Sequence, residues 1–145
     1  MNAQVIPDRD SMFDHISRLL NLKVASEADL FRISQAGVSN TSFKRAIAAL
    51  GIPIGLIGPE TTMRRRLDEN QRLKPSETER LLRVARVFAE AVNLFGDEGA
   101  AKAWMNTPGD FLTDQPATTP AQLAAFDSGA RLIEAKIKRT AYGIF

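Results

Sequence analysis

The feature that most constrains the fold is a long apolar segment in the middle of the chain, KPSETERLLRVARVFAEAVNLFG, from Lys74 to Gly96. Its apolar residues recur at steps of three and four, the period of an α-helix, at Leu81, Val84, Ala85, Phe88, Ala91, Val92 and Phe95. A second row widens this apolar arc at Leu82, Val87 and Leu94. A helix that is apolar over most of its circumference is normally buried between two layers. We therefore expect a central helix with half of the chain on each side of it and with Phe88 and Phe95 buried between the halves, although a plain core helix would show the same pattern.

The ends of this segment carry helix-capping residues. Ser76 and Glu79 have the spacing of a capping box, in which each side chain accepts a hydrogen bond from the other residue's backbone N–H. This pattern predicts that Ser76 is the N-cap of the helix, with Pro75 just outside it. Gly96 suits the left-handed position that follows the last turn of a helix.

The remaining chain also has the pattern of helices. Further starts are predicted at Ser26, Ser39, Asp97 and Thr119, the last as a second capping box with Gln122, and glycines at positions 37 and 51 predict helix ends. No stretch shows the strict alternation of apolar and polar residues that marks a strand. We expect an all-α protein of six to nine helices with short connections.

Composition narrows the class of protein. The 145 residues are enough for one or two small domains. The chain contains no cysteine, which excludes disulfides and cysteine-based metal sites. No apolar run approaches the roughly 20 residues of a membrane span, and the first residues lack the basic and then apolar pattern of a secretory signal. We expect a cytoplasmic protein that has no membrane partner.

Positive charge is concentrated in the first half of the chain. Residues 1–74 carry 11 Lys and Arg against 8 Asp and Glu, a net charge of +3, whereas residues 75–145 carry 8 against 9, a net charge of −1. The excess lies mainly in residues 61–74, where five basic side chains accompany two acidic ones. A local basic cluster without a basic amphipathic helix that has an aromatic face favours nucleic acid over a membrane surface.

This basic segment follows a possible helix-turn-helix. A helix through Phe43 ends at Gly51, a Gly-Pro break follows at Gly58, and a basic helix begins at Glu60. The first residues of the second helix in such a motif face base edges in the major groove. The predicted DNA-binding residues are Thr61, Thr62, Arg64, Arg65 and Arg66. The alternative is a solvated basic face, and the two glycines and the proline between Pro53 and Gly58 make the preceding segment weak as a helix.

The three consecutive arginines cannot have the same role. Successive residues of an α-helix are about 100° apart, so Arg64, Arg65 and Arg66 cannot all face one groove. At least one of them should point to phosphates or to an acidic neighbour.

No catalytic constellation is present in the sequence. With no cysteine and a single histidine, His15, the usual nucleophile–base pairs are impossible or lack support. His15 itself is better explained as a surface or packing residue than as a ligand or a base. Without a strand, no glycine-rich phosphate loop is expected either. The carboxylates are scattered along polar helix faces. The sequence therefore favours a binding module over an enzyme, with no catalytic residue, cofactor or metal site.

Three longer segments resemble a known family. These are TTMRRRLDENQRLKPSETERLLRVARV, FGDEGAAKAWMNTP and SGARLIEAKIKRTAYGIF, which are similar to antitoxins of the Xre/MbcA/ParS type over about residues 40–145. The matching positions are Thr62, Arg65, Arg66, Ser76, Glu77, Arg80, Leu81, Phe95, Gly96, Ala101, Trp104, Gly129 and Gly143. The sequence departs from the family pattern at Met105 and in the loop 113–116, where the family has Leu and a Gly-Gly-x-x-Pro segment.

This resemblance implies a protein with two binding functions. Residues 1–74 would form a helix-turn-helix domain that makes a homodimer and binds the operator of its own operon. Residues 75–145 would form a helical domain that binds and blocks a RES-domain toxin, which consumes NAD. The rival interpretation is a stand-alone transcriptional regulator whose C-terminal half only makes it a dimer. The gene neighbourhood distinguishes the two interpretations, because only the antitoxin interpretation requires a RES-type gene beside the gene of this protein.

The C-terminal end is the predicted toxin-binding site. Antitoxins similar to this chain press their C-terminal end into the active-site cleft of the toxin. The predicted toxin-binding residues are Lys138, Arg139, Tyr142, Gly143, Ile144 and Phe145. An aromatic ring beside a cation and the terminal carboxylate would suit a cleft that accepts the rings and phosphates of NAD. The alternative is that this end folds back as a hydrophobic cap on its own domain.

Overall fold

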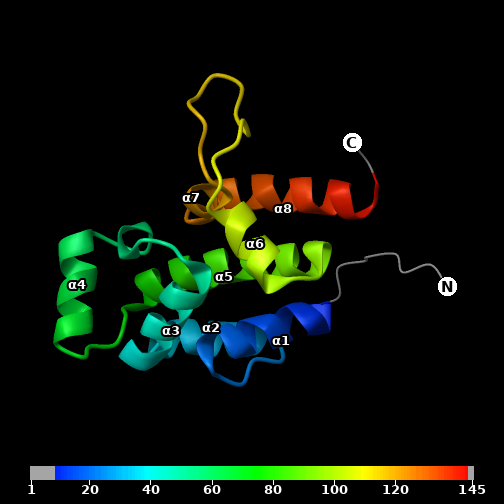
Figure 1. Ribbon diagram of the computed structural model, residues 1–145. Coiled ribbons are helices and arrows are strands. Elements are labelled where there is room, and N and C mark those ends of the chain that lie inside the picture. Colours follow the sequence, from blue (N-terminus) through cyan, green and yellow to red (C-terminus); the bar gives the residue numbers. More distant parts are fainter. Residues whose placement is uncertain (1–8, 144–145) are drawn as a thin grey trace.

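The computed structural model describes residues 9–143, and this part of the chain is helical, which confirms the predicted fold class. Eight α-helices and one short 3₁₀ helix, η1, are present among these residues. They are α1 (Arg9–Leu20), α2 (Glu27–Ala36), α3 (Asn40–Leu50), η1 (Ile54–Leu56), α4 (Glu60–Asp68), α5 (Pro75–Phe95), α6 (Glu98–Met105), α7 (Pro120–Ala124) and α8 (Asp127–Ala141). The long connection between α6 and α7 projects from the molecule and carries one isolated antiparallel bridge, between Gly109 and Thr118 (Figure 1).

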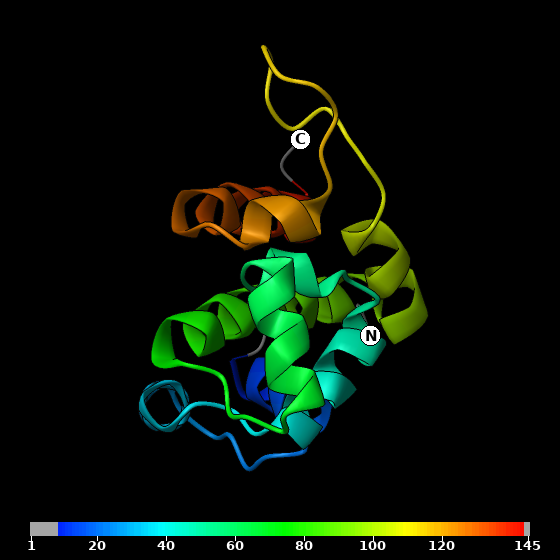
Figure 2. The same ribbon diagram turned by 90° about the vertical axis from the view of Figure 1, so that its left-hand side faces the viewer.

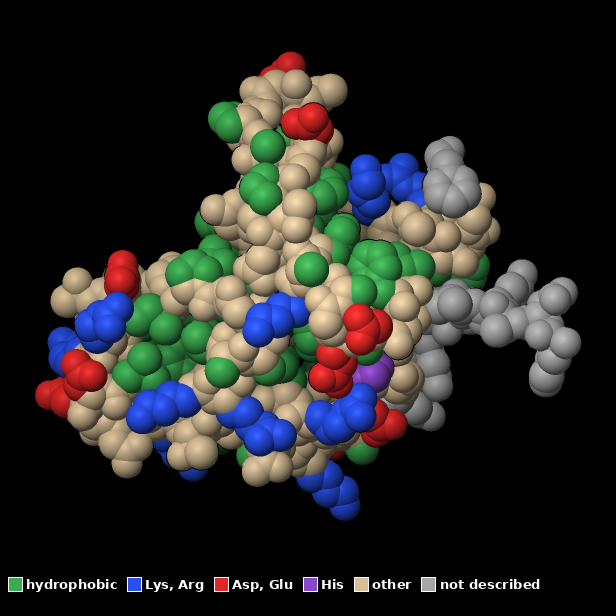
Figure 3. All heavy atoms as spheres, viewed as in Figure 1, with side chains coloured by type: hydrophobic (Ala, Val, Ile, Leu, Met, Phe, Trp, Pro, Cys, Tyr) green, Lys and Arg blue, Asp and Glu red, His purple; other side chains and the backbone are tan. Residues whose placement is uncertain are grey.

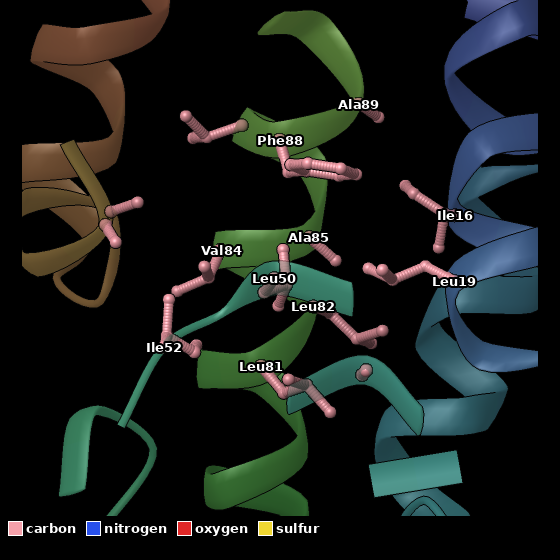
Figure 4. Packing of buried hydrophobic residues seen from close by; sticks show 14 of the residues in the cluster. Ile16, Leu19, Leu50, Ile52, Leu81, Leu82, Val84, Ala85, Phe88 and Ala89 are labelled. Atoms are coloured by element: carbon pink, nitrogen blue, oxygen red, sulfur yellow. The ribbon is translucent and has the colours of Figure 1, made fainter. Parts of the chain in front are cut away.

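Helix α5 lies at the centre of the molecule (Figure 1). It packs against α1 and α2 on one side and against α6, α7 and α8 on the other, as the sequence predicted for a central helix. In Figure 4, Leu82, Ala85 and Phe88 point toward α1, whereas Val84 points the other way, toward Ile52. The buried hydrophobic residues form one cluster that extends from Met12 in α1 to Ile137 in α8. The division into domains 1–74 and 75–145 stays a prediction, because both sets of helices share the core around α5.

The start of α5 differs from the prediction. The helix begins at Pro75 and its N-cap is Lys74, so the proposed capping box of Ser76 with Glu79 is wrong. The carboxylate of Glu77 instead accepts a hydrogen bond of 2.8 Å from the backbone N–H of Lys74. Proline fits this first helical position because its missing N–H would have no partner there. The predicted end is confirmed: Gly96 has φ +71° and donates its N–H to the carbonyl of Val92.

The helix starts predicted at Ser26, Ser39, Asp97 and Thr119 are confirmed. Ser26, Ser39, Asp97 and Thr119 are N-caps, and each side chain accepts a hydrogen bond from the backbone N–H three residues later. Thr119 and Gln122 form the reciprocal capping box, with distances of 3.0 and 2.9 Å. These caps satisfy backbone donors that have no partner within the helix.

The two phenylalanines predicted to be buried behave differently. Phe88 is 4% exposed, as predicted, but Phe95 is 41% exposed, so the prediction is wrong for Phe95. Phe95 is the last residue of α5, and Trp104 of α6 covers it from one side, with the two rings edge to face at 5.8 Å. The helical period identifies the inward face of α5 but not the point at which neighbouring helices stop covering it.

Phe88→Ala and Phe95→Ala form a matched pair that tests this difference. We expect Phe88→Ala to lower the free energy of unfolding by about 3–5 kcal/mol, because it leaves a cavity in a packed core. Phe95→Ala should cost only about 1 kcal/mol, mostly through the lost aromatic contact. Chemical denaturation monitored by circular dichroism measures both values. Equal losses would contradict the burial described here.

Candidate partner-binding surfaces

Helix α4 carries the predicted DNA-binding residues and lies at one end of the molecule, nearest the viewer in Figure 2. Met63 is fully buried and fixes the inward face of the helix. Thr61, Arg64 and Arg65 are exposed and Thr62 is half-buried. Their contact with DNA stays a prediction, since the structure contains no nucleic acid.

Arg66 faces the interior, so its side chain is not available for the predicted contact with DNA. Its guanidinium makes a bidentate ion pair with Glu77 of α5, with Nε–Oε1 at 2.7 Å and Nη2–Oε2 at 3.1 Å. The two side chains are only 8% and 11% exposed. The carbonyl of Arg66 also accepts a hydrogen bond from the side-chain amide of Asn40, at the start of α3. Arg66 is thus the arginine that points to an acidic neighbour, and it ties α4 to α3 and α5.

The exposed face of α4 is not basic. Arg64 pairs with Glu60 at 3.1 Å, and Arg65 lies 3.8 Å from Glu69. With Asp68, this face holds two basic and three acidic side chains, a net charge of 2 − 3 = −1. Blue and red side chains accordingly alternate over α4 in Figure 3. The basic excess read from the sequence is therefore largely cancelled at the surface of this helix.

A second pair of helices, α2 and α3, has a connection as short as that of a helix-turn-helix, and the sequence analysis did not identify it. Only residues 37–39 separate α2 from α3, whereas residues 51–59, including η1, separate α3 from α4. A break of three or four residues, often with glycine, is typical of the motif. Gly37 has φ +79°, and a Cβ there would overlap the carbonyl oxygen of Leu73. The signal was present in the sequence as a glycine stop followed by the N-cap Ser39.

A groove of about 750 Å³ lies between α1, α3 and α6. Its walls carry Arg18, Arg45 and Lys102, with the single acidic side chain Glu98. Figure 3 shows blue Lys and Arg side chains distributed over α1, α3 and α6 on this face, near the purple histidine. The sequence analysis did not identify this groove.

His15 contributes to the geometry of the groove. The Arg18 guanidinium donates to its Nδ1 at 2.7 Å, so Nε2 carries the proton and donates to the side-chain oxygen of Asn93 at 3.0 Å. These contacts agree with the interpretation of His15 as a surface and packing residue. Among residues 9–143, no three His, Asp or Glu side chains are grouped closely enough to hold a metal ion. None of the helices in this range has the length and apolar character needed to cross a membrane.

Helix α8 carries the predicted toxin-binding residues at its C-terminal end. Its inward face consists of Ala130, Ile133 and Ile137. Gly129 lets α8 approach α7 closely, because a Cβ at this position would overlap the carbonyl oxygen of Leu123. The helix is therefore held at its start, and its last turn extends along the surface.

The last described residues are directed to solvent. Lys138 and Arg139 are exposed in the last turn of α8, and Tyr142 is 59% exposed. Gly143 has φ +72°, a conformation that glycine adopts without strain, and its surroundings are open. Ile144 and Phe145 lie outside the described residues. As far as Gly143, this end does not fold back as a cap on the core.

A buried carboxylate lies where α5 and α8 meet. Glu90 is 8% exposed, and its Oε2 accepts no hydrogen bond from any residue between Arg9 and Gly143. Burial, and after it the nearby carboxylate of Glu134, raise the pKa of Glu90 to about 7, against the opposing effects of Lys138 and Arg86. The core of α5 thus contains a carboxyl group that is partly protonated near neutral pH, close to the predicted toxin-binding end.

Glu90→Gln should alter how stability depends on pH. Because the pKa of Glu90 is raised in the folded protein, the folded chain binds more protons than the unfolded chain between pH 4.5 and about 7. The free energy of unfolding should therefore fall as pH rises through this range, by at most about 3 kcal/mol. We expect Glu90→Gln to stabilise the protein at pH 8 and to remove this slope, as measured by denaturation at several pH values. Glu79→Gln, exposed on the same helix, is the control; an unchanged slope in Glu90→Gln would show that the carboxylate is well solvated.

The chain is similar to curated antitoxins. It is 36% identical over 88 residues to Antitoxin Xre of Yersinia enterocolitica, across 60% of this chain and 57% of that protein. It is 31% identical over 85 residues to Antitoxin Xre of Pseudomonas putida, across 59% of this chain and 52% of that protein. The chain thus spans just over half the length of these relatives. No family model matches the sequence.

Proposed function

We propose that this chain is the antitoxin of a two-gene toxin–antitoxin module. The observation that carries the proposal is its similarity to two Xre antitoxins over about three fifths of its length. In this proposal the C-terminal half blocks a RES-type toxin that degrades NAD, and the N-terminal half forms a homodimer and binds the operator of the operon. The RES-type toxin comes from the family resemblance of residues 40–145, and the chain acts by binding and not as an enzyme.

The exposed end of α8 supports a role in blocking a toxin. Tyr142 places an aromatic ring in solvent, within one helical turn of two exposed cations, Lys138 and Arg139. A cleft that binds NAD accepts flat rings and charged groups, and a Tyr ring is a rigid group of that shape. Gly143 gives the chain a sharp change of direction at this point. We propose that these residues, followed by Ile144 and Phe145, occupy the cleft of the toxin and exclude NAD.

A stand-alone regulator is the second candidate. The short connection between α2 and α3 and the basic groove favour it, because neither feature requires a toxin. Coexpression with the adjacent genes separates the two functions. An antitoxin should copurify with a RES-type protein encoded by a neighbouring gene, whereas a regulator of this kind would purify without one.

Removal of residues 142–145 tests the proposed plug. We expect the truncated chain to fold with an unchanged melting temperature and to bind DNA as the full chain does, because Tyr142 is exposed and lies beyond the inward face of α8. It should no longer protect cells that express the toxin, and cellular NAD should fall. Phe31→Ala, which removes an equally exposed aromatic ring from α2, is the control and should still protect. Full protection by the truncated chain would place neutralisation elsewhere on the C-terminal half.

A further inference from the structure

We propose that the pocket between α2, α5 and the first turn of α8 binds a free α-amino acid with an apolar side chain. The pocket has a volume of about 370 Å³, which is near the small end of the range for ligand sites in proteins. It lies at the opposite end of α8 from Tyr142, and its lining includes none of the residues predicted to bind DNA or a toxin. The inference therefore goes beyond the proposed function and does not depend on it.

Two polar atoms in the wall of this pocket are buried without a hydrogen-bond partner. They are the hydroxyl oxygen of Ser34 on α2 and the Nε of Arg83 on α5, and neither is bonded to any residue in the described range 9–143. Ser34 as a whole is only 3% exposed. Buried polar groups in native proteins nearly always have a partner, so each exception requires an explanation. Because both groups can donate a hydrogen bond, the carboxylate of a ligand is a suitable partner for them.

The unpaired charges of the pocket are of both signs. Arg86 is occupied by its bidentate ion pair with Glu27, at 2.7 and 2.6 Å. Arg83 and Glu79 also line the pocket, and within residues 9–143 neither has an ion-pair partner. Their spacing of four residues on α5 would allow them to pair with each other, yet they do not. A ligand carboxylate can pair with Arg83, and a ligand ammonium group can pair with Glu79.

The net charge of the pocket excludes simpler ligands. Asp127 adds a third carboxylate, which it shares with Arg131 at 3.1 Å in an exposed pair. The lining thus holds two arginines and three carboxylates, a net charge of 2 − 3 = −1. An anion such as phosphate would meet net repulsion, and a simple amine would leave Arg83 unpaired. A zwitterion has no net charge and satisfies both signs.

The apolar part of the pocket indicates the side chain of the ligand. Leu30 and Leu82 line it and are 6% and 7% exposed, whereas Phe31, which also lines it, is 65% exposed. An exposed aromatic ring beside a pocket can cover a bound apolar group and remove it from water. The pocket therefore combines an apolar surface with one partner for a carboxylate and one for an ammonium group, which are the three parts of an apolar amino acid.

Isothermal titration calorimetry of the purified full chain, without toxin or DNA, tests this assignment. The ligands are L-leucine and three analogues that each lack one part: leucinamide lacks the carboxylate, 4-methylpentanoic acid lacks the amine, and glycine lacks the apolar side chain. The variants are Arg83→Gln, Glu79→Gln and Phe31→Ala. Arg32→Gln and Glu69→Gln remove exposed charges outside the pocket and are the matched controls. Melting temperatures verify that each variant is folded.

We expect leucine to bind and to raise the melting temperature, because a ligand that binds only the folded state stabilises it. Each analogue should bind more weakly than leucine. Arg83→Gln should weaken leucine binding by about tenfold or more, since it removes a hydrogen bond between charged groups. Glu79→Gln should weaken the binding of leucine but not that of 4-methylpentanoic acid. Phe31→Ala should reduce the preference for leucine over glycine, and the two control variants should bind leucine as the unmodified chain does.

Three results would overturn the proposal. No binding of leucine at millimolar concentration would show that the two unpartnered atoms are hydrated and hold no amino acid. Binding of 4-methylpentanoic acid as tight as that of leucine would show a site for simple carboxylates. Equal binding of leucine by Arg83→Gln and by the unmodified chain would place the ligand outside this pocket. None of these results bears on toxin neutralisation, which is measured in cells with the truncated chain.

Discussion

Burial of α5 on both sides is the constraint on which the rest of the structure depends. Residues on this helix contribute to the core from Leu81 to Val92, and helices from both ends of the sequence pack on it. Removal of so much apolar surface from water is the dominant favourable term in folding. Helices that precede α5 and helices that follow it pack against it. The two candidate binding surfaces are therefore positioned by one shared element.

This constraint explains which features the sequence could predict. The inward face of α5, the caps at Ser26, Ser39, Asp97 and Thr119, and the left-handed Gly96 depend on residues close together in the chain, and the structure confirms them. The N-cap of α5 was placed two residues late, at Ser76 instead of Lys74, because two acidic residues follow Pro75 and spacing alone selected Glu79 instead of Glu77. The end of α5 was misjudged because the exposure of Phe95 depends on α6 and not on the helical period.

The candidate sites could be predicted from the sequence less completely than the helices. The sequence alone does not distinguish the three adjacent arginines from one another. Only the ion pair with Glu77, 11 residues later in the chain, shows that Arg66 is buried. The cancelled charge on α4 also depends on which acidic side chains share its exposed face. The groove requires Arg18, Arg45 and Lys102 to meet from three helices, and no local pattern brings them together. By contrast, the exposed end of α8 follows the sequence closely, because its apolar face simply ends before Tyr142.

A single core that carries two binding surfaces should unfold as one unit, and differential scanning calorimetry of the full chain tests this most directly. We predict one transition in which the calorimetric enthalpy equals the van't Hoff enthalpy, the criterion for two-state unfolding. Two resolved transitions, or a calorimetric enthalpy well above the van't Hoff value, would show that the helices before and after α5 fold separately and would contradict the shared core.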